Sequence, residues 1–417
     1  MVRVSRIWLG NGAEWIAVQD PETPSFYLCV ATKNGEESEA DYDGEDIVLK
    51  SVGSTHQIEH MNMISSPAQE TYRLSHDRFS CRITVDGETD LTSCYSYFRG
   101  PFRHKKRIIE ESLEAIFREY DEEQFEVQRS VIAQELREAA GDREWTKLSD
   151  VMKQMLYPGT PYGLSYLDIL KHVPGLDMRM TMKIRDDLMR GNNITIVTVS
   201  KDNRRELEPY VRGAFEMIPA GNRWRPYPVD IAHTEKLHHV EARDYLPTCF
   251  VQHNLRTSKV TPEMMATMDV LSNLLGVPDT GTLYVELREK IGSVYAPSVE
   301  TNFERPAPSL DILYTCEPRY LDMNHGVVHK QMESLAENLV MENELNKYRD
   351  FARRNKGALF DTTYDTIQWL VVNSSQGIYI TPRQYLKLIE QVSPEHVREM
   401  AYDIVNNGIA TVVFRPG

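Results

Sequence analysis

The sequence predicts two domains in which helices cover β-sheets, in the α+β or the α/β class. Its 417 residues exceed the usual size of one hydrophobic core, so two domains of roughly 200 residues are expected. Segments typical of strands, at residues 26–31, 79–85, 250–254 and 310–314, occur in both halves among amphipathic helical segments. Their order lacks the strict alternation of strand and helix that predicts a doubly wound parallel sheet.

The two halves of the chain end with the same pattern. Residues 185–193 have helical character that stops at a G-N-N break, and the β-branched segment 194–199 then predicts a strand. About 214 positions later, a helical segment from residue 397 stops at an N-N-G break, and residues 409–414 predict the strand that follows. An offset of half the chain is typical of a duplicated domain.

The segment between the halves predicts a linker. Residues 219–228 read P-A-G-N-R-W-R-P-Y-P, which is rich in residues that break helices and strands and shows no periodicity. The expected domains are therefore residues 1–222 and residues 223–417.

Composition and charge narrow the range of functions. The chain is 41% hydrophobic, contains no apolar run near the roughly 18–20 residues that span a bilayer, and begins without the pattern of a secretory signal. Its five cysteines lack C-x-x-C spacing, which disfavours a disulfide framework or a thiolate metal site. The net charge of -15 disfavours nucleic-acid binding and would attract basic peptides. We therefore expect a cytoplasmic protein that binds neither nucleic acid nor membrane.

The segment from His56 to His60 reads H-Q-I-E-H and is the most specific feature of the sequence. On a helix the two histidines lie one turn apart on one face, so both imidazoles can reach a single cation, and Glu59 lies beside them. This H-x-x-E-H order places two zinc ligands next to a general base. The alternative is a polar helix face that contacts only solvent.

A catalytic zinc site usually has three protein ligands, so a third must come from elsewhere in the chain. Residues 121–124 resemble a capping box, and the helix expected after them carries Phe125, Ile132 and Glu135 on one apolar stripe. A carboxylate on such a face costs several kcal/mol unless it is paired or binds a metal. Glu135 is therefore the candidate third ligand, and pairing with an arginine of a neighbouring helix is the alternative. Glu138, three residues further on, has polar neighbours and is expected to be solvated.

Three other polar clusters have simpler interpretations. His325 and His329 share the i,i+4 spacing but lack a glutamate at the base position, so we expect no metal there. His238 and His239 would point to opposite faces of a strand, where a lone histidine is more often structural. The acidic residues between 36 and 46 lack the ligand order of a calcium loop and are expected to form a solvated loop.

The histidine motif is followed about 75 residues later by a glutamate in V-I-A-Q-E, and this combination resembles the pitrilysin/insulinase family of zinc metallopeptidases, the inverzincins. The second half contains R-E-K-I-G-S-V-Y, from Arg288 to Tyr295, which is similar to the R-E-x-x-G-x-x-Y segment of that family. Residues 344–359 are similar to a family helix that begins with E-L. The resemblance therefore covers both halves of the chain.

This resemblance implies an α+β fold of two repeated domains, each a mostly antiparallel sheet covered by helices. It implies one Zn²⁺ per chain, held by His56, His60 and Glu135, with Glu59 as the general base that acts on zinc-bound water. Arg288 and Tyr295 would donate hydrogen bonds to the substrate or the oxyanion. The implied activity is that of a zinc metalloendopeptidase.

The length of the chain resembles the short, processing-peptidase-like branch of the family, in which two chains close as a clamshell around a peptide or an unfolded polypeptide. A homodimer would be self-sufficient, with Arg288 and Tyr295 acting across the dimer interface, and a heterodimer is the alternative. The substrate would add a strand to a sheet edge, for which residues 79–85 are the candidate.

The sequence also departs from the family pattern. Gln128 stands where a second glutamate is common, Ser54, Thr55 and Gln57 replace apolar residues or alanine in and before the motif, and the glycine usual after the motif is missing. These departures leave the ligands and the base in place but predict altered substrate choice, and Gln128 leaves the tuning of the metal open. Two other functions therefore stay in view: a non-catalytic peptide-binding or assembly subunit on the same fold, and a scaffold stabilised by a closed zinc site.

Overall fold

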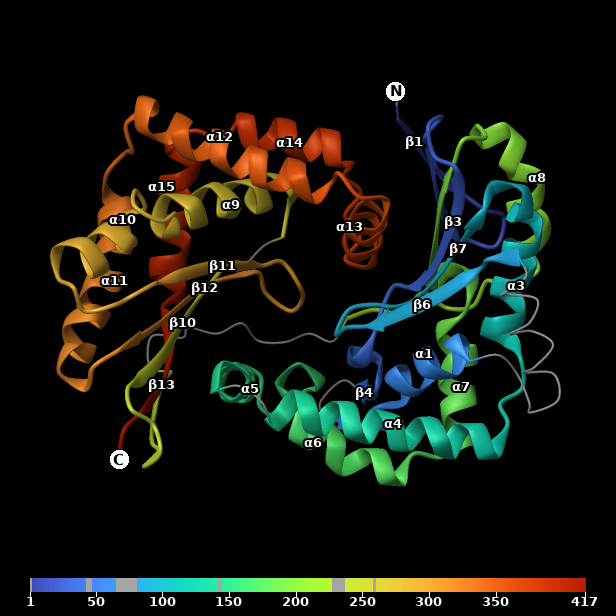
Figure 1. The fold of residues 1–417 in the computed structure, drawn as a ribbon, viewed down its shortest axis with the longest axis horizontal. Coiled ribbons are helices and arrows are strands. Elements are labelled where there is room, and N and C mark those ends of the chain that lie inside the picture. Colours follow the sequence, from blue (N-terminus) through green and yellow to red (C-terminus); the bar gives the residue numbers. More distant parts are fainter. Residues whose placement is uncertain (1, 43–46, 65–80, 142–143, 227–236, 258–259) are drawn as a thin grey trace. The chain divides into compact units, whose positions relative to one another are not determined.

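The computed structural model describes residues 2–42, 47–64, 81–141, 144–226, 237–257 and 260–417. The chain forms two compact units, each assembled from three segments (Figure 1). The first unit comprises Met1–Ala139, Tyr166–Tyr227 and Thr363–Tyr379, and the second comprises Ala140–Ser165, Pro228–Thr362 and Ile380–Gly417. Below, "half" refers to the sequence and "unit" to the structure.

The first unit is built on a six-stranded sheet. In spatial order its strands are β1 (Arg3–Trp8), β2 (Glu14–Gln19), β8 (Ile194–Ser200), β3 (Ser25–Thr32), β7 (Cys94–Pro101) and β6 (Thr84–Thr89). Only β2 and β8 run parallel; the other neighbours are antiparallel. A separate two-stranded ladder joins β4 (Ala40–Tyr42) and β5 (Ile47–Leu49).

The second unit is built on a five-stranded sheet. Its spatial order is β11 (Ser298–Asn302), β12 (Ser309–Cys316), β10 (Cys249–Arg256), β13 (Ile409–Arg415) and β9 (His238–Ala242), and only β13 and β9 run parallel. Without β1, each sheet has its first strand in the chain beside its fifth, then its second, fourth and third. The predicted α+β fold of two repeated, mostly antiparallel sheets is therefore confirmed.

The helices follow the same repeat. Those of the first half are α1 (Ser54–Met63), α3 (Lys105–Phe117), α4 (Glu122–Gly141), α5 (Glu144–Leu156), α6 (Tyr166–His172), α7 (Met178–Leu188) and α8 (Arg204–Phe215). Those of the second half are α9 (Pro262–Gly276), α10 (Thr282–Tyr284), α11 (Leu321–Glu337), α12 (Glu342–Leu359), α13 (Thr363–Ser375), α14 (Pro382–Glu390) and α15 (Pro394–Asn407). A π-helical turn, Val285–Lys290, continues α10, and single 3-10 turns form at Glu36–Ser38, Phe102–His104, Pro161–Gly163, Val173–Gly175, Gly191–Asn193 and Pro318–Tyr320. By position in the repeat, α1 corresponds to α9, α4 to α12, and α5 to α13.

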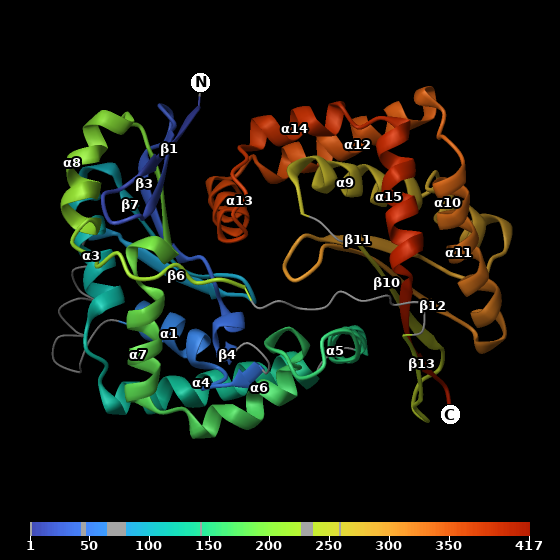
Figure 2. The same cartoon turned by 180° about the vertical axis from the view of Figure 1, so that it is seen from behind.

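The central strands of the first sheet are buried on both faces. On β2, Trp15 and Ala17 point into one hydrophobic cluster, whereas Ile16 and Val18 point into another. Residues of α3 and α8 complete the first cluster, and residues of α13 complete the second (Figure 2). Alternate residues of one strand thus join two separate cores.

Each unit takes one helix from the other half of the sequence. Helix α13, from the second half, packs on β8 and β3 in the first unit. Helix α5, from the first half, packs on β10 and β13 in the second unit, where the rings of Trp145 and Phe250 have centroids 4.9 Å apart. The two helices hold equivalent positions in the repeat, so the halves at 1–222 and 223–417 exchange equivalent elements.

Candidate metal centre

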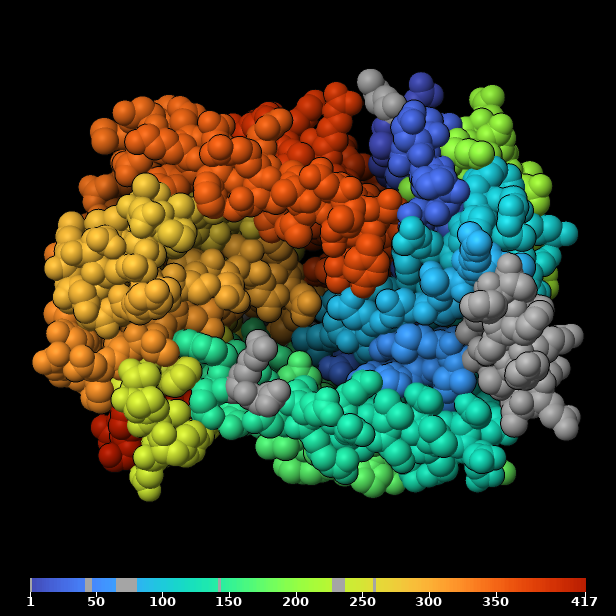
Figure 3. Space-filling model, in the orientation of Figure 1, coloured from blue at the N-terminus to red at the C-terminus, as the bar shows by residue number. Residues whose placement is uncertain are grey.

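Helix α1 brings the three motif residues together beside α4. The donor atoms of His56, Glu59 and His60 all lie within 4.8 Å of one another. Glu135 of α4 reaches the same place, because its Oε2 atom lies 3.3 Å from Nε2 of His56 and 3.3 Å from Nε2 of His60. Figure 3 shows the surfaces of α1, in blue, and α4, in teal, next to one another. The two histidines and Glu135 therefore face one point.

The spacing of these atoms fits a tetrahedral zinc site. Ligand bonds of about 2.1 Å at tetrahedral angles place neighbouring ligand atoms about 3.4 Å apart. Both nitrogen-to-oxygen distances are 3.3 Å. Burial, with a smaller contribution from His60, lowers the pKa of His56 to about 4, so this ring is neutral near pH 7 and keeps a free lone pair. Two imidazoles and one carboxylate are also a donor set typical of catalytic zinc.

Gln128 orients one of the candidate ligands. Its Oε1 atom lies 3.0 Å from Nδ1 of His60, a contact satisfied when Nδ1–H donates to the amide oxygen. That tautomer leaves the lone pair of Nε2 directed at Glu135. The residue that departs from the family pattern thus occupies the position from which a metal-binding histidine is usually oriented.

Glu135 reaches the site from a different environment than the one predicted. Its side chain is 49% exposed, so the expectation that it lies on a buried apolar stripe is wrong. The buried face of α4 is formed by Phe125, Ile132 and Leu136, and Glu135 lies at its margin. The argument from the cost of burial therefore does not apply to this carboxylate, although the helix does bring it to the histidines.

Glu59 lies in a closely packed place between α1 and the edge strand β6. Its side chain is buried, and burial raises its pKa to about 7, against the lowering effects of His60 and of the nearby Thr89 side chain. Gly87 of β6 lies so close that a Cβ atom there would be 2.9 Å from Cγ and 3.2 Å from Oε1 of Glu59. A carboxylate whose pKa lies near 7, beside two histidines, can both accept and return a proton at neutral pH.

Glu39 is a site residue that the sequence analysis missed. Its carboxylate accepts hydrogen bonds of 2.6 Å from N–H of Gly53, N–H of Thr55 and Oγ1 of Thr55. These donors are at the start of α1, where Gly53 has no side chain to act as a cap. Glu39 is 2% exposed, so the interpretation of residues 36–46 as a solvated loop is wrong at this position. Burial raises its pKa to about 8, and the hydrogen bonds from Thr55 and Gly53 reduce that effect.

Arg288 and Tyr295, the two residues that the family resemblance implies as hydrogen-bond donors to the substrate, contact each other in the second unit. Nη1 of Arg288, in the π-helical turn, donates a 2.7 Å hydrogen bond to the carbonyl of Tyr295, and the guanidinium lies 4.8 Å from the centroid of the Tyr295 ring. The Tyr295 side chain is 79% exposed. Their role toward a substrate stays a prediction.

The candidate substrate strand is only partly described. Residues 79 and 80 lie outside the described ranges, and the edge strand of the first sheet is β6, Thr84–Thr89, which shares two residues with the expected segment 79–85. Within the described ranges β6 pairs only with β7, so its other edge is open.

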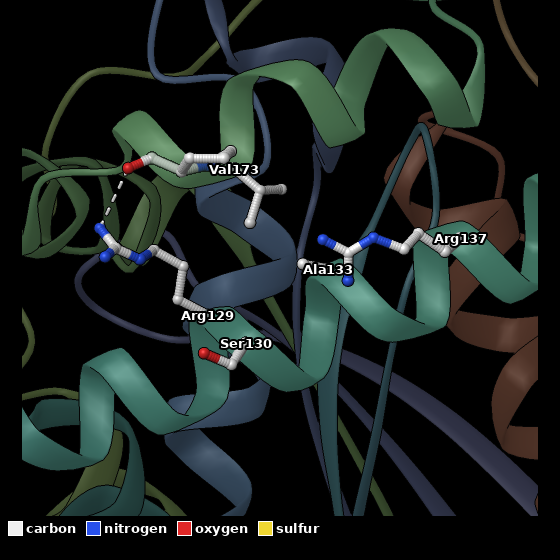
Figure 4. A pocket seen from close by; sticks show the side chains of 6 residues that line it. Arg129, Ser130, Ala133, Arg137 and Val173 are labelled. Carbon is white, nitrogen blue, oxygen red and sulfur yellow. Dashed lines mark hydrogen bonds between the residues drawn. The ribbon is translucent and has the colours of Figure 1, made fainter.

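A cavity of about 280 Å³ lies on a different side of α4 (Figure 4). Its lining includes Arg129, Ala133 and Arg137, and Arg129 also donates to the carbonyl of Pro174. Ala133 and Arg137 are each two positions from Glu135, so they point about 200° around the helix from it. This cavity therefore does not belong to the candidate metal centre.

Comparison with known proteins identifies the fold. Residues 183–351 match the family described as "Peptidase M16 inactive domain", a range that contains neither the histidine motif nor Glu135. No curated protein sequence matches the chain. In the part of the chain that the structure describes, no helix has the length and apolar character needed to cross a membrane.

Solved structures resemble the whole chain. A protease from Helicobacter pylori has a TM-score of 0.82 at 15% identity, with both chains covered completely. A peptidase M16 inactive domain from Pseudomonas fluorescens has a TM-score of 0.80 at 15% identity, covering 100% of this chain and 98% of that one. The periplasmic protease PqqL from Escherichia coli has a TM-score of 0.76 at 14% identity, and the match covers 100% of this chain but 46% of PqqL. The chain therefore has the fold of the M16 peptidases, and the pitrilysin-like resemblance predicted from its sequence is confirmed at the level of fold.

Proposed function

We propose that this protein is a zinc-dependent endopeptidase that hydrolyses peptides or unfolded polypeptides. One observation carries the proposal: Oε2 of Glu135 lies 3.3 Å from Nε2 of His56 and 3.3 Å from Nε2 of His60, the spacing of neighbouring tetrahedral ligand positions, with Glu59 beside them. A structural polar helix face does not require three donors from two helices to meet at one point.

The residues of the site have distinct tasks in this mechanism. His56, His60 and Glu135 would hold Zn²⁺, which lowers the pKa of a coordinated water to about 7 and polarises a carbonyl group. Glu59 accepts the proton of the attacking water and returns it to the leaving amine. Its position under β6 excludes bulk solvent, which strengthens its interaction with nearby charges.

Substrate binding follows from the open edge of the first sheet. An extended peptide can add a strand to β6, and the main chain then supplies affinity that does not depend on sequence. Asp86 and Glu88 lie on this strand, and the chain has a net charge of -15, so basic peptides are favoured. Arg288 and Tyr295 would donate hydrogen bonds to the substrate or oxyanion, where one donor contributes about 3 kcal/mol. A cytoplasmic homodimer in which they act across the interface belongs to the same proposal.

A second candidate is a non-catalytic peptide-binding or assembly subunit. The observation that favours it is the family description of residues 183–351, which names an inactive domain. The candidate ligands and the base lie outside that range. Both candidate functions use the same fold, and they differ in whether the bound peptide is cleaved.

The variant Glu59→Gln tests the proposal. We expect it to bind zinc at wild-type stoichiometry and to lose turnover by about 10² to 10⁴-fold, because only the proton acceptor is removed. The purified protein would be incubated with a mixed peptide library, with and without chelator, and cleavage read by mass spectrometry.

Glu138→Gln is the matched control, because Glu138 lies on exposed α4 surface and contacts Gln134. Full cleavage by Glu59→Gln would end the peptidase proposal. Peptide binding without cleavage by the wild-type, zinc-loaded protein would favour the second candidate.

A further inference from the structure

Four histidines from three elements meet in the second unit. His238 belongs to β9, His253 to β10, and His325 and His329 to α11. The ring centroid of His325 lies 5.9 Å from that of His238, 5.4 Å from that of His253 and 4.3 Å from that of His329. For comparison, the two rings of the candidate metal centre are 4.8 Å apart. Folding thus creates a second histidine cluster from residues that the sequence separates.

One member of the cluster is a structural core residue. His253 is fully buried, and its Nδ1 and Nε2 atoms contact Oγ1 of Thr411 at 2.9 Å and the hydroxyl of Tyr314 at 3.0 Å. Both nitrogens are therefore satisfied, and His253 forms the floor of the cluster. It is not available as a ligand.

The other three histidines lie nearer to solvent. His238 is exposed, and His325 and His329 are half-buried. Nε2 of His329 is shielded from solvent and has no hydrogen-bond partner among the atoms of the described ranges. A buried nitrogen that lacks a partner is unfavourable, and a bound cation would satisfy it.

Acidic side chains extend the same face of α11. Asp322, His325, His329 and Glu333 follow one another at steps of three, four and four residues, which places them along one side of the helix. Asp322 acts electrostatically on His325, and Glu333 acts on His329. The two carboxylates make the histidine pair a favourable place for a positive ion.

In contrast to the expectation from the sequence, we propose that His325, His329 and His238 form a binding site for a divalent transition-metal ion of the kind that prefers imidazole, such as Zn²⁺, Ni²⁺ or Cu²⁺. Two histidines at i,i+4 on a helix form the core of the site, and imidazole is a suitable ligand for these ions. His238 stacks on His325 at an interplanar angle of 17°, and its exposed ring turns to complete the site. The ion then fastens α11 to β9, which is an edge strand of the second sheet.

This site is independent of the proposed peptidase activity and uses no residue of the first unit. It is expected to be weaker than the candidate metal centre, because within the described ranges that centre alone already holds at least three potential ligand atoms within 4.8 Å of one another.

The test uses the 417-residue chain with the candidate metal centre removed by His56→Ala and His60→Ala. Metal-free protein would be titrated with Co²⁺, which reports its ligands through visible absorption bands, and with Zn²⁺ against a chromophoric chelator. We expect about one ion per chain to remain bound. Adding His325→Gln to this background should weaken binding about tenfold or more.

His172→Ala in the same background is the matched control, because His172 is an exposed histidine outside the cluster and its loss should change nothing. Hydrogen exchange provides a readout that does not depend on the variants of the cluster: Zn²⁺ should slow exchange of residues 238–242 and of α11. The proposal is overturned if the double variant binds no metal, if His325→Gln binds as tightly as the control, or if exchange of these segments is unaffected by Zn²⁺.

Discussion

Gly87 allows the edge strand β6 to pass directly beside Glu59. A Cβ atom at this position would lie 2.9 Å from Cγ of Glu59 and 3.1 Å from the carbonyl oxygen of Tyr95. The first contact is too short for real carbon atoms, and the second involves backbone that cannot move aside easily. Because Gly87 has no side chain, the Glu59 carboxylate has room to lie against β6 in this position.

The variant Gly87→Ala should separate catalysis from metal binding. We expect the added methyl group to displace Glu59 and lower kcat/KM by about tenfold or more, because small misplacements of catalytic groups are costly. Zinc content should stay unchanged, since the atoms nearest to the added methyl group belong to Glu59 and Tyr95 and not to His56, His60 or Glu135. Steady-state kinetics and elemental analysis on the same sample measure both quantities.

Gly213→Ala on α8 is the control, because a Cβ there would meet nothing within 4 Å. An unchanged kcat/KM in Gly87→Ala with intact folding would show that Glu59 does not depend on this contact.

At the residue scale, the sequence predicts contacts that lie within one helical turn. His56, Glu59 and His60 are set by a spacing that the chain itself imposes. Glu135 reaches the same point from a second helix. The prediction that its side chain is buried was wrong, because a small rotation about the helix axis separates a buried position from an exposed one at the margin of the buried face. Glu39 could not be found, because its partners are main-chain N–H groups and its neighbours in sequence are typical of a solvated loop.

Helix α1 depends on a carboxylate from outside the helix. Gly53 at its start has a φ of 90° and offers no side-chain acceptor, and Glu39 supplies both oxygens to the first N–H groups instead. The orientation of the whole histidine motif is thus tied to one buried acid.

This buried acid predicts how stability changes with pH. The folded-state pKa of Glu39 is raised by burial to about 8, above its usual value of 4.5. Between these values the unfolded chain has released the proton and the folded chain still holds it, so the contribution of Glu39 to stability is full below 4.5 and is lost as pH rises through 8.

Glu39→Gln, which cannot titrate, should flatten this dependence. The difference in free energy of unfolding between pH 5 and pH 8 should shrink by about 1 kcal/mol or more, measured by urea unfolding in chelator. Glutamine cannot accept all of the hydrogen bonds that Glu39 accepts, and their loss lowers stability equally at every pH. The slope of the free energy of unfolding against pH therefore reports only the titration of Glu39. If the free energy of unfolding changed with pH in the same way in both proteins, Glu39 would be ionised in the folded chain across the whole range from pH 5 to pH 8.

The repeat preserves elements and not the site. Helix α9 occupies the place of α1 but carries no histidine, and its buried Asp269 pairs instead with Lys356 of α12 at 3.2 Å and with the hydroxyl of Tyr385 of α14 at 2.5 Å. An ion pair with added hydrogen bonds can take the place of a metal between equivalent helices, because it satisfies the buried charge. The second unit therefore keeps the fold without the histidine motif.

The repeat itself could be predicted from sequence only in part. The helix that ends at Gly408 and the strand after it were predicted, because a glycine at a helix end and a β-branched run are local signals. The order of strands in each sheet could not be predicted in this way, since pairing joins segments distant in sequence. The exchange of α5 and α13 has no local signal for the same reason.

At the scale of the whole molecule, this exchange makes the two halves of the sequence depend on each other. Ile367, Leu370 and Val371 of α13 are buried in a cluster with residues of β2, β3, β7 and β8. The second unit receives α5 in return, and its Ser149 donates a 3.2 Å hydrogen bond to Gln252 of β10. A change in either half of the sequence can therefore weaken the sheet formed by the other half.

The variant Leu370→Ala tests this dependence. Leu370 is 2% exposed, and removal of a buried leucine side chain costs about 2–5 kcal/mol. We expect faster hydrogen exchange in β3 and β8 of the first unit, more than 160 residues away in sequence, because they lose the support of α13. The sheet of the second unit should keep its protection.

Leu148→Ala on α5 is the mirror-image control. Leu148 is fully buried, and its loss should open β10 and β13 while leaving β3 and β8 protected. Both variants remove the same atoms from equivalent helices, so only the assignment of each helix to its unit predicts opposite patterns. If each variant instead loosened the sheet of its own half of the sequence, α5 and α13 would not be exchanged in solution, and the two halves would fold as continuous domains.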